Sequence, residues 1–342
     1  MDSLSKLLKN KSFYIYVFLF VIGIVVGVMG TKSSVITKII NQTNGSPPPS
    51  GTLEAHSGQF NLIDPLYECN TGENYGQEKL TSLEKTISDY IDKIEAGNST
   101  ERASVYFRDL NNGPWFGINE TDEFSPSSLL KVPVMMAYYK YAEDNPAILN
   151  KKIKYTVDPP GLLPQNFPPS SPLVKGKTYT IEELIERMII QSDNVALYYL
   201  EQNIDPNLID KVTIDLGITT ATNTTPQDFM NVQEYSTLFR VLYYATYLNQ
   251  QYSQQALKLL SQADFTNGIV APLPKNLTVA HKFGERDLGN GEHQLHDCGV
   301  VYNTGRPYLL CIMTKGPNYP DLEATIQQIS NKVYKEFTRF YP

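Results

Sequence analysis

Serine and lysine side chains three positions apart could form a nucleophile and its base, and this chain of 342 residues repeats that spacing. The Ser-x-x-Lys tetrapeptide occurs three times, as Ser3 with Lys6, Ser82 with Lys85, and Ser128 with Lys131. Residues three apart on a helix share a face, so the lysine amine can reach the serine hydroxyl. A serine hydroxyl needs such a base to become a nucleophile. The spacing alone permits this chemistry, and the surroundings must decide whether it occurs.

Only the third pair lies in apolar surroundings, in the stretch FSPSSLLKVPVMMAYYK. Ser125 can cap a helix that starts at Pro126 and is apolar around much of its girth, which is typical of a buried helix. Burial favours the neutral, proton-accepting form of Lys131, and the helix N-terminus could stabilise an oxyanion. The alternative is that Ser127 and Ser128 are polar first-turn residues while Lys131 extends to water.

Two later motifs could complete such a site. The first is SDN at residues 192–194, at a break between helices, and the second is HKFG at residues 281–284, on a predicted strand. Taken alone, the first could be a turn with Asx hydrogen bonds and the second an edge-strand lysine. Because both motifs follow Ser128 in this order, the three motifs together indicate a single site.

The elements that must position these motifs follow from periodicity and turn residues. A capping box from Thr81 to Glu84 predicts the start of a first helix, and a second box joins Thr180 to Glu183. Strands are predicted at 103–110, 114–119, 277–285, 296–302 and 308–316, and helices at 81–97, 126–140, 178–191, 195–202, 227–247 and 321–337. Strands at both ends predict an α+β fold, with one antiparallel sheet flanked by helices and an inserted all-helical lobe. A Pro-rich loop covers residues 158–172.

In this order, the three motifs resemble those of the penicillin-recognising serine hydrolases, most closely the class A β-lactamase family. The order of helices and strands is similar to that family over residues 71–342. The resemblance implies that Ser128 is the acylated nucleophile and Lys131 its general base. Ser192 would relay a proton to the leaving atom, beside the positive charge of Lys282. The backbone N–H groups of Ser128 and Glu285 would form the oxyanion hole.

The resemblance also implies a set of residues that bind or support the substrate. Asn194 would hydrogen-bond the acyl side chain and Lys131, while Asp193 would hold the loop of the helical lobe. The remaining expected substrate-binding residues are Phe283, Gly284 and Arg286. Ser127 is set aside only by the register of the motif, because a serine four residues before Lys131 could also reach it.

The sequence departs from the family at two places. Phe283 replaces a threonine or serine that would bind the substrate carboxylate, so this recognition is weakened or moved to Arg286. The family's Glu-x-x-x-Asn loop, whose glutamate activates the deacylating water, looks absent. The acidic residues in the interval 205–276 are Asp205, Asp210, Asp215, Asp228, Glu234 and Asp264, and Glu234 has no asparagine four residues later.

These departures predict an acyl-enzyme at Ser128 that turns over β-lactams slowly. The expected substrate is a small molecule or peptide, either a β-lactam or D-Ala-D-Ala-like, and no cofactor or metal is expected. Two alternatives stay open: a D,D-peptidase, transpeptidase or esterase acting on cell-wall-type substrates, and a non-catalytic wall-binding module on the same fold. A net charge of -7 without a basic run in the globular part argues against a nucleic-acid partner.

The N-terminal segment predicts attachment to a membrane. After a flank of residues 1–12, residues 13–30 carry no charge and approach the roughly 20 residues that span a bilayer. A cleaved signal peptide is the alternative, but its apolar region is usually shorter. Residues 31–70 are predicted as a linker and 71–342 as the hydrolase domain. With three lysines before the span and two after it, the N-terminus is expected in the cytoplasm and the domain outside a bacterial-type cell membrane.

Cys298 and Cys311 flank a predicted hairpin turn at Thr304 and Gly305. If those are the two turn residues, the residue numbers of any two facing positions add up to 609. Because 298 and 311 also add up to 609, the two cysteines would lie opposite each other. A disulfide and a pair of buried free thiols are both compatible with this pattern.

Overall fold

The structure is a computed structural model and describes residues 61–65, 77–97, 99–111, 113–162, 164–222 and 224–340. The chain divides into two units, Met1–Ser57 and Gly58–Pro342, and every described residue belongs to the second. The predicted anchor at 13–30, the linker apart from 61–65, and Cys69 lie outside the described residues. In the described part, no helix is long and apolar enough to cross a membrane.

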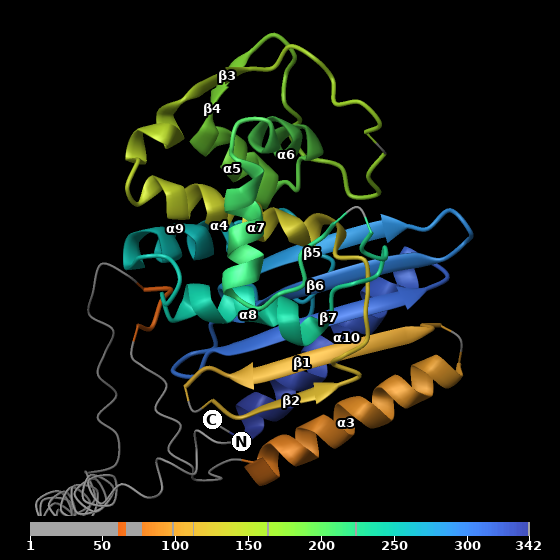
Figure 1. Cartoon of the computed structure of the whole chain (residues 1–342). Helices are drawn as coiled ribbons and strands as arrows, with labels where there is room; N and C mark the ends of the chain where they lie inside the picture. Colours follow the sequence, from red (N-terminus) through yellow and green to blue (C-terminus); the bar gives the residue numbers. More distant parts are fainter. Residues whose placement is uncertain are drawn as a thin grey trace, which may run out of the picture. The chain divides into compact units, whose positions relative to one another are not determined.

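A five-stranded antiparallel sheet joins the two ends of the second unit (Figure 1). Its order is β2-β1-β7-β6-β5. The strands are β1 Arg102–Asp109, β2 Trp115–Ile118, β5 Val279–Asp287, β6 His293–Val301 and β7 Tyr308–Gly316. The predicted α+β sheet built from both chain ends is confirmed, since β1 pairs with β7 along its whole length. Strand β5 is an edge strand, so one side of its backbone is free to face a ligand.

Helices cover both faces of the sheet and divide the core into two clusters. On one face lie α3 Gln77–Ala96 and α10 Tyr319–Phe340, whose apolar residues recur at helical spacing and are buried. On the other face lie α8 Val232–Tyr243 and the inserted lobe (Figure 1). The lobe therefore packs against one face of the sheet.

The lobe was predicted to be all-helical, and this is wrong because a short antiparallel pair lies within it. Strands β3 Lys152–Lys154 and β4 Thr178–Thr180 pair with each other and bring the two ends of the Pro-rich loop together. The helical elements are α4 Lys131–Ala142, η2 Pro146–Asn150, α5 Ile181–Ile190, α6 Asn194–Glu201, α7 Pro206–Asp215 and α9 Gln250–Leu260. Helix α5 starts with the predicted capping box between Thr180 and Glu183.

Helices α3 and α8 begin at other residues than predicted. Helix α3 begins at Gln77, so Thr81 and Glu84 lie inside it and do not cap it. Helix α8 begins after Asn231, whose side chain accepts from the backbone N–H of Glu234, and not near residue 227. The prediction rested on local residue types, and at α8 the capping side chain is that of Asn231, four residues after the predicted start.

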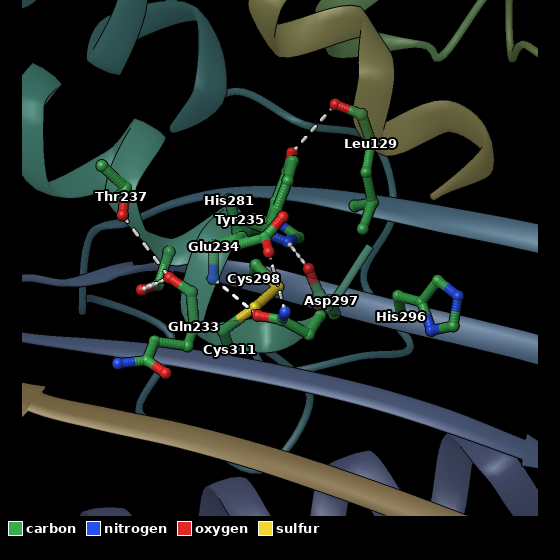
Figure 2. Close-up of a disulfide and its surroundings, with 12 residues drawn as sticks. Leu129, Gln233, Glu234, Tyr235, Thr237, His281, His296, Asp297, Cys298 and Cys311 are labelled. Carbon is green, nitrogen blue, oxygen red and sulfur yellow. Dashed lines mark hydrogen bonds and ion pairs between the residues drawn. A yellow bond between two sulfur atoms is a disulfide. The ribbon is translucent and has the colours of Figure 1, made fainter. Parts of the chain in front are cut away.

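The β6–β7 hairpin carries a disulfide between Cys298 and Cys311 (Figure 2). The two residues lie opposite each other in the ladder, which is the register that the turn arithmetic expects. Both side chains are fully buried, on the face of the sheet that α8 covers.

Candidate active site

Ser128 lies on a short 3₁₀ helix, η1 Ser127–Leu130, directly before Lys131 at the start of α4. The prediction that Ser125 caps an α-helix beginning at Pro126 is wrong, because Ser127 has a φ of 48° and η1 has no side-chain cap. Side chains at i and i+3 of a 3₁₀ helix eclipse one another, which aligns Ser128 with Lys131. The Nζ atom of Lys131 lies 3.0 Å from the Oγ atom of Ser128.

The two adjacent serines face different partners. The Oγ atom of Ser127 lies 3.4 Å from that of Ser125, whereas the Oγ atom of Ser128 contacts Lys131. Ser128 is also half-buried, which leaves its hydroxyl accessible. The geometry therefore favours Ser128 over Ser127 as the nucleophile.

Strand β5 passes close beside η1 at Gly284. A Cβ atom added there would lie 3.0 Å from both the Leu129 Cγ atom and the Pro126 carbonyl oxygen. Only glycine leaves this space free, so the backbones can approach. The predicted oxyanion hole depends on this approach, because its N–H groups come from Ser128 on η1 and Glu285 on β5.

Two buried polar side chains donate hydrogen bonds to backbone carbonyls in and just before η1. The Tyr235 hydroxyl donates to the Leu129 carbonyl at 3.1 Å, and Figure 2 shows this contact above the disulfide. The Thr314 backbone N–H donates to Nδ1 of His296, so the proton of the neutral ring lies on Nε2, which donates to the Ser125 carbonyl at 3.0 Å. Burial lowers the pKa of His296 to about 4, which keeps this ring neutral.

Lys131 is 1% exposed, and four oxygen atoms surround its amine. Besides Ser128, its Nζ atom contacts the carbonyl of Ser192 at 2.6 Å, the Oγ atom of Ser192 at 3.0 Å and the Oδ1 atom of Asn194 at 2.6 Å. Burial lowers the pKa of Lys131 to about 7, against the opposing charges of Asp193, Glu285 and Glu201. In the neutral amine, two N–H groups can serve the carbonyl and amide oxygens, and the lone pair is left for a hydroxyl proton.

Ser192 lies between two lysine amines. The Lys282 Nζ atom is 2.9 Å from the Ser192 Oγ atom and 2.8 Å from the Phe283 carbonyl oxygen. Burial, and then the charge of Lys131, lowers the pKa of Lys282 well below its usual value. Ser192 has a φ of 54°, and Asp193 caps α6 by accepting from the N–H groups of Val195 and Ala196. The break between helices at residues 192–194 thus places the Ser192 hydroxyl between the amines of Lys131 and Lys282.

Two expected substrate-binding side chains are placed differently from the prediction. Phe283 is 4% exposed, and its ring stacks on Phe265 at a centroid distance of 4.2 Å, so the ring is a packing group. Arg286 donates from Nη1 to the Ser125 hydroxyl at 2.9 Å. Its guanidinium also donates to the Gln227 amide oxygen, in the amide orientation that satisfies both groups.

The Pro-rich loop reaches the site, which the sequence reasoning did not predict. Gln165 donates from Nε2 to the Ser192 carbonyl at 3.1 Å. The backbone N–H groups of Asn166 and Phe167 donate to the two carboxylate oxygens of Glu285, each at 3.1 Å. No local signal marks these residues, because their partners lie far away in the sequence.

Five of the six acidic residues of the interval 205–276, all except Asp210, have side-chain partners away from Ser128. Asp205 caps α7, Asp215 pairs with Lys211, and Glu234 accepts from the N–H groups of Thr219 and Asn231. Asp228 accepts from Gln294, and Asp264 from Ser170. In the described part of the chain, none of these carboxylates contacts Ser128 or Lys131. The same part holds no cluster of three His, Cys, Asp or Glu side chains suited to a metal ion.

The fold and the serine–lysine centre define a serine hydrolase of the class A β-lactamase kind. Residues 83–337 match the family described as the beta-lactamase enzyme family, and the chain belongs to this family. Beta-lactamase VEB-1 from Pseudomonas aeruginosa is 26% identical over 225 residues, which is 58% of this chain and 72% of that protein.

Solved structures show the same fold. A mutant of PBP-A, as an acyl-enzyme complex with penicillin G, matches with a TM-score of 0.64 and 22% identity, over 76% of this chain and 97% of that one. A class A beta-lactamase from Mycobacterium abscessus matches with a TM-score of 0.62 and 21% identity, over 74% and 99%. At these identities the likeness is one of fold, and the chemistry must be argued from this chain's own residues.

Proposed function

We propose that this chain is a membrane-anchored, extracytoplasmic serine hydrolase that forms an acyl-enzyme at Ser128 and releases it slowly. The carrying observation is the 3.0 Å contact between the Ser128 hydroxyl and a buried Lys131 amine whose pKa is about 7. Penicillin-type lactams and D-Ala-D-Ala-like peptides are the proposed acyl donors, supported by the family and by the penicillin complex of PBP-A.

Acylation would proceed through the groups already described. The Ser128 Oγ atom bonds to the substrate carbonyl carbon while its proton passes to the Lys131 amine. The N–H groups of Ser128 and Glu285 stabilise the oxyanion. The bond from the carbonyl carbon to the leaving nitrogen or oxygen then breaks, and that atom takes the proton from Lys131 by way of the Ser192 hydroxyl.

Slow release is proposed because deacylation needs a base for water. None of the carboxylates between residues 205 and 276 contacts Ser128 or Lys131 in the described part of the chain, and we propose that Lys131 or Ser192 activates the water. A chromogenic cephalosporin tests this claim. We expect a burst of about one equivalent followed by slow hydrolysis; sustained rapid hydrolysis that disappears in Ser128→Ala would refute slow release.

The same centre would also serve an esterase or a D,D-peptidase. The observation that favours an esterase is Phe283, because a buried phenyl ring offers no hydroxyl to a substrate carboxylate. Product analysis on D-Ala-D-Ala peptides and on simple esters separates these activities. A non-catalytic role would be supported if a fluorophosphonate failed to label Ser128.

Membrane attachment is proposed from the uncharged stretch at residues 13–30 and from the linker composition that follows it. The lysine distribution around this stretch supports a cytoplasmic N-terminus.

A further inference from the structure

On the basis of the proposed acyl-enzyme function, we propose that Glu285 makes this site select substrates whose leaving group carries no carboxylate. The preferred acyl donors would be neutral esters, thioesters or amides. Carboxylate-bearing lactams and peptides would be acylated more slowly by the same serine.

The leaving group must lie between Ser192 and β5. Ser192 is the group placed to protonate it, and Lys282 on β5 holds the Ser192 hydroxyl at 2.9 Å. The Pro-rich loop crosses the same space, because Gln165 contacts the Ser192 carbonyl while the next two residues contact Glu285. The Glu285 carboxylate therefore lies at the side of the site where the leaving group departs.

The charge of Glu285 acts directly on the reaction centre. It raises the pKa of both Lys131 and Lys282 against the larger effect of burial. Its carboxylate accepts the backbone N–H groups of Asn166 and Phe167, which fix its position beside the site. An anionic leaving group would meet this fixed negative charge in a partly desolvated site, where like charges repel more strongly than in water.

The basic side chains near Glu285 already have hydrogen-bond partners. The amine of Lys282 is fully buried between the Ser192 hydroxyl and the Phe283 carbonyl. The Arg286 guanidinium donates to Ser125 and Gln227. At this part of the described site, Phe283 adds no hydroxyl that could balance a second carboxylate.

Matched thioesters of benzoyl-D-alanine test the inference on the full chain in detergent. One carries mercaptoacetate as its leaving group and the other mercaptoacetamide, so the pair differs in charge but little in size. Attack by Ser128 breaks the carbon–sulfur bond, and the released thiol is measured alongside the intact mass of the acylated protein. We expect kcat/KM to be about tenfold higher for the amide, with the ratio falling at high salt.

Three variants separate charge from loop position. Glu285→Gln should raise the ratio of kcat/KM for the mercaptoacetate thioester to that for the amide thioester about tenfold, because any change in Lys131 affects both substrates alike and cancels in the ratio. Glu285→Asp keeps the charge and should keep the discrimination, although it also disturbs the contacts with the Pro-rich loop. Asp89→Asn removes an exposed charge on α3 and should leave the ratio unchanged.

Equal rates for the two thioesters in the unmodified chain, or a preference for mercaptoacetate, would overturn this inference while leaving the acyl-enzyme intact. Equal effects of Glu285→Gln and Glu285→Asp would also overturn it, because the loop and not the charge would then control selection. If neither thioester acylates Ser128, the proposed function itself fails.

Discussion

At the scale of single residues, burial of the Lys131 side chain lowers its pKa and so allows its amine to act as a base. An exposed lysine would hold its proton at neutral pH, but this side chain is 1% exposed and has a pKa of about 7. The cost of burying an ammonium is relieved when the amine becomes neutral. The same amine then accepts the proton that Ser128 must lose to attack a carbonyl.

The pH dependence of acylation follows from this pKa. Below about pH 7 Lys131 is mostly protonated and cannot accept a proton, so the acylation rate should rise about tenfold per pH unit there. Above about pH 7 the rate should level off. Single-turnover acylation by a penicillin, followed by quenching and mass measurement, gives this profile.

Lys131→Arg provides the matched control, because arginine stays charged over the whole pH range. Its acylation rate should fall by a factor of about 10³ or more, with no rise near pH 7. A rate in the unmodified chain that does not change between about pH 5 and 8 would contradict the role of Lys131 as the base.

The positions of these side chains are set by contacts between elements. Strand β5 and helix η1 approach most closely at Gly284, where a Cβ atom would lie 3.0 Å from the Pro126 carbonyl oxygen. We expect Gly284→Ala to displace η1 from β5 and to slow acylation about 10- to 100-fold, because small misplacements in a reacting site cost that much. Stopped-flow acylation and a thermal melt would measure the effect on rate and on stability.

Gly97→Ala is the matched control for that substitution. The nearest atom to an added Cβ there is 3.4 Å away, at the end of α3 and on the opposite face of the sheet. It should leave acylation unchanged. A normal acylation rate in Gly284→Ala would show that the close approach of β5 does not position the nucleophile.

The disulfide between Cys298 and Cys311 links strands β6 and β7 across the hairpin. In a Cys69→Ser chain, alkylation should add nothing without reductant and two groups after reduction and unfolding. Loss of the bridge should lower the free energy of unfolding by about 2–3 kcal/mol, as expected for a short closed loop. Two alkylated cysteines in the unreduced, unfolded chain would contradict the bridge.

The elements with strong periodicity, and the site residues within motifs, could be predicted from sequence. Ser128, Lys131, Ser192 and Lys282 each stand in a local pattern, and their order along the chain indicates one site. The contact between Asn166 and Glu285 could not be predicted, because 119 residues separate them and the Pro-rich loop has no periodicity. The 3₁₀ turn at η1 was missed because its positive φ at Ser127 is set by packing against β5 and not by local propensity.

At the scale of the whole molecule, the residues proposed for catalysis all belong to the unit Gly58–Pro342. The proposed anchor lies in the unit Met1–Ser57. Removal of residues 1–57 should therefore transfer the protein from the detergent phase to the aqueous phase in a phase-separation assay. Acylation of Ser128 should stay within about twofold of the full chain, because every group that surrounds Lys131 is retained. A full chain that partitions into the aqueous phase would contradict membrane anchoring.

The most direct test of the central claim is an intact-mass time course of the full chain with penicillin G. We expect one covalent adduct that peptide mapping places on Ser128, that persists long after free penicillin is removed, and that forms in Ser127→Ala but not in Ser128→Ala. An adduct on another residue, or no adduct at any time together with no hydrolysis of the penicillin, would contradict an acyl-enzyme at Ser128.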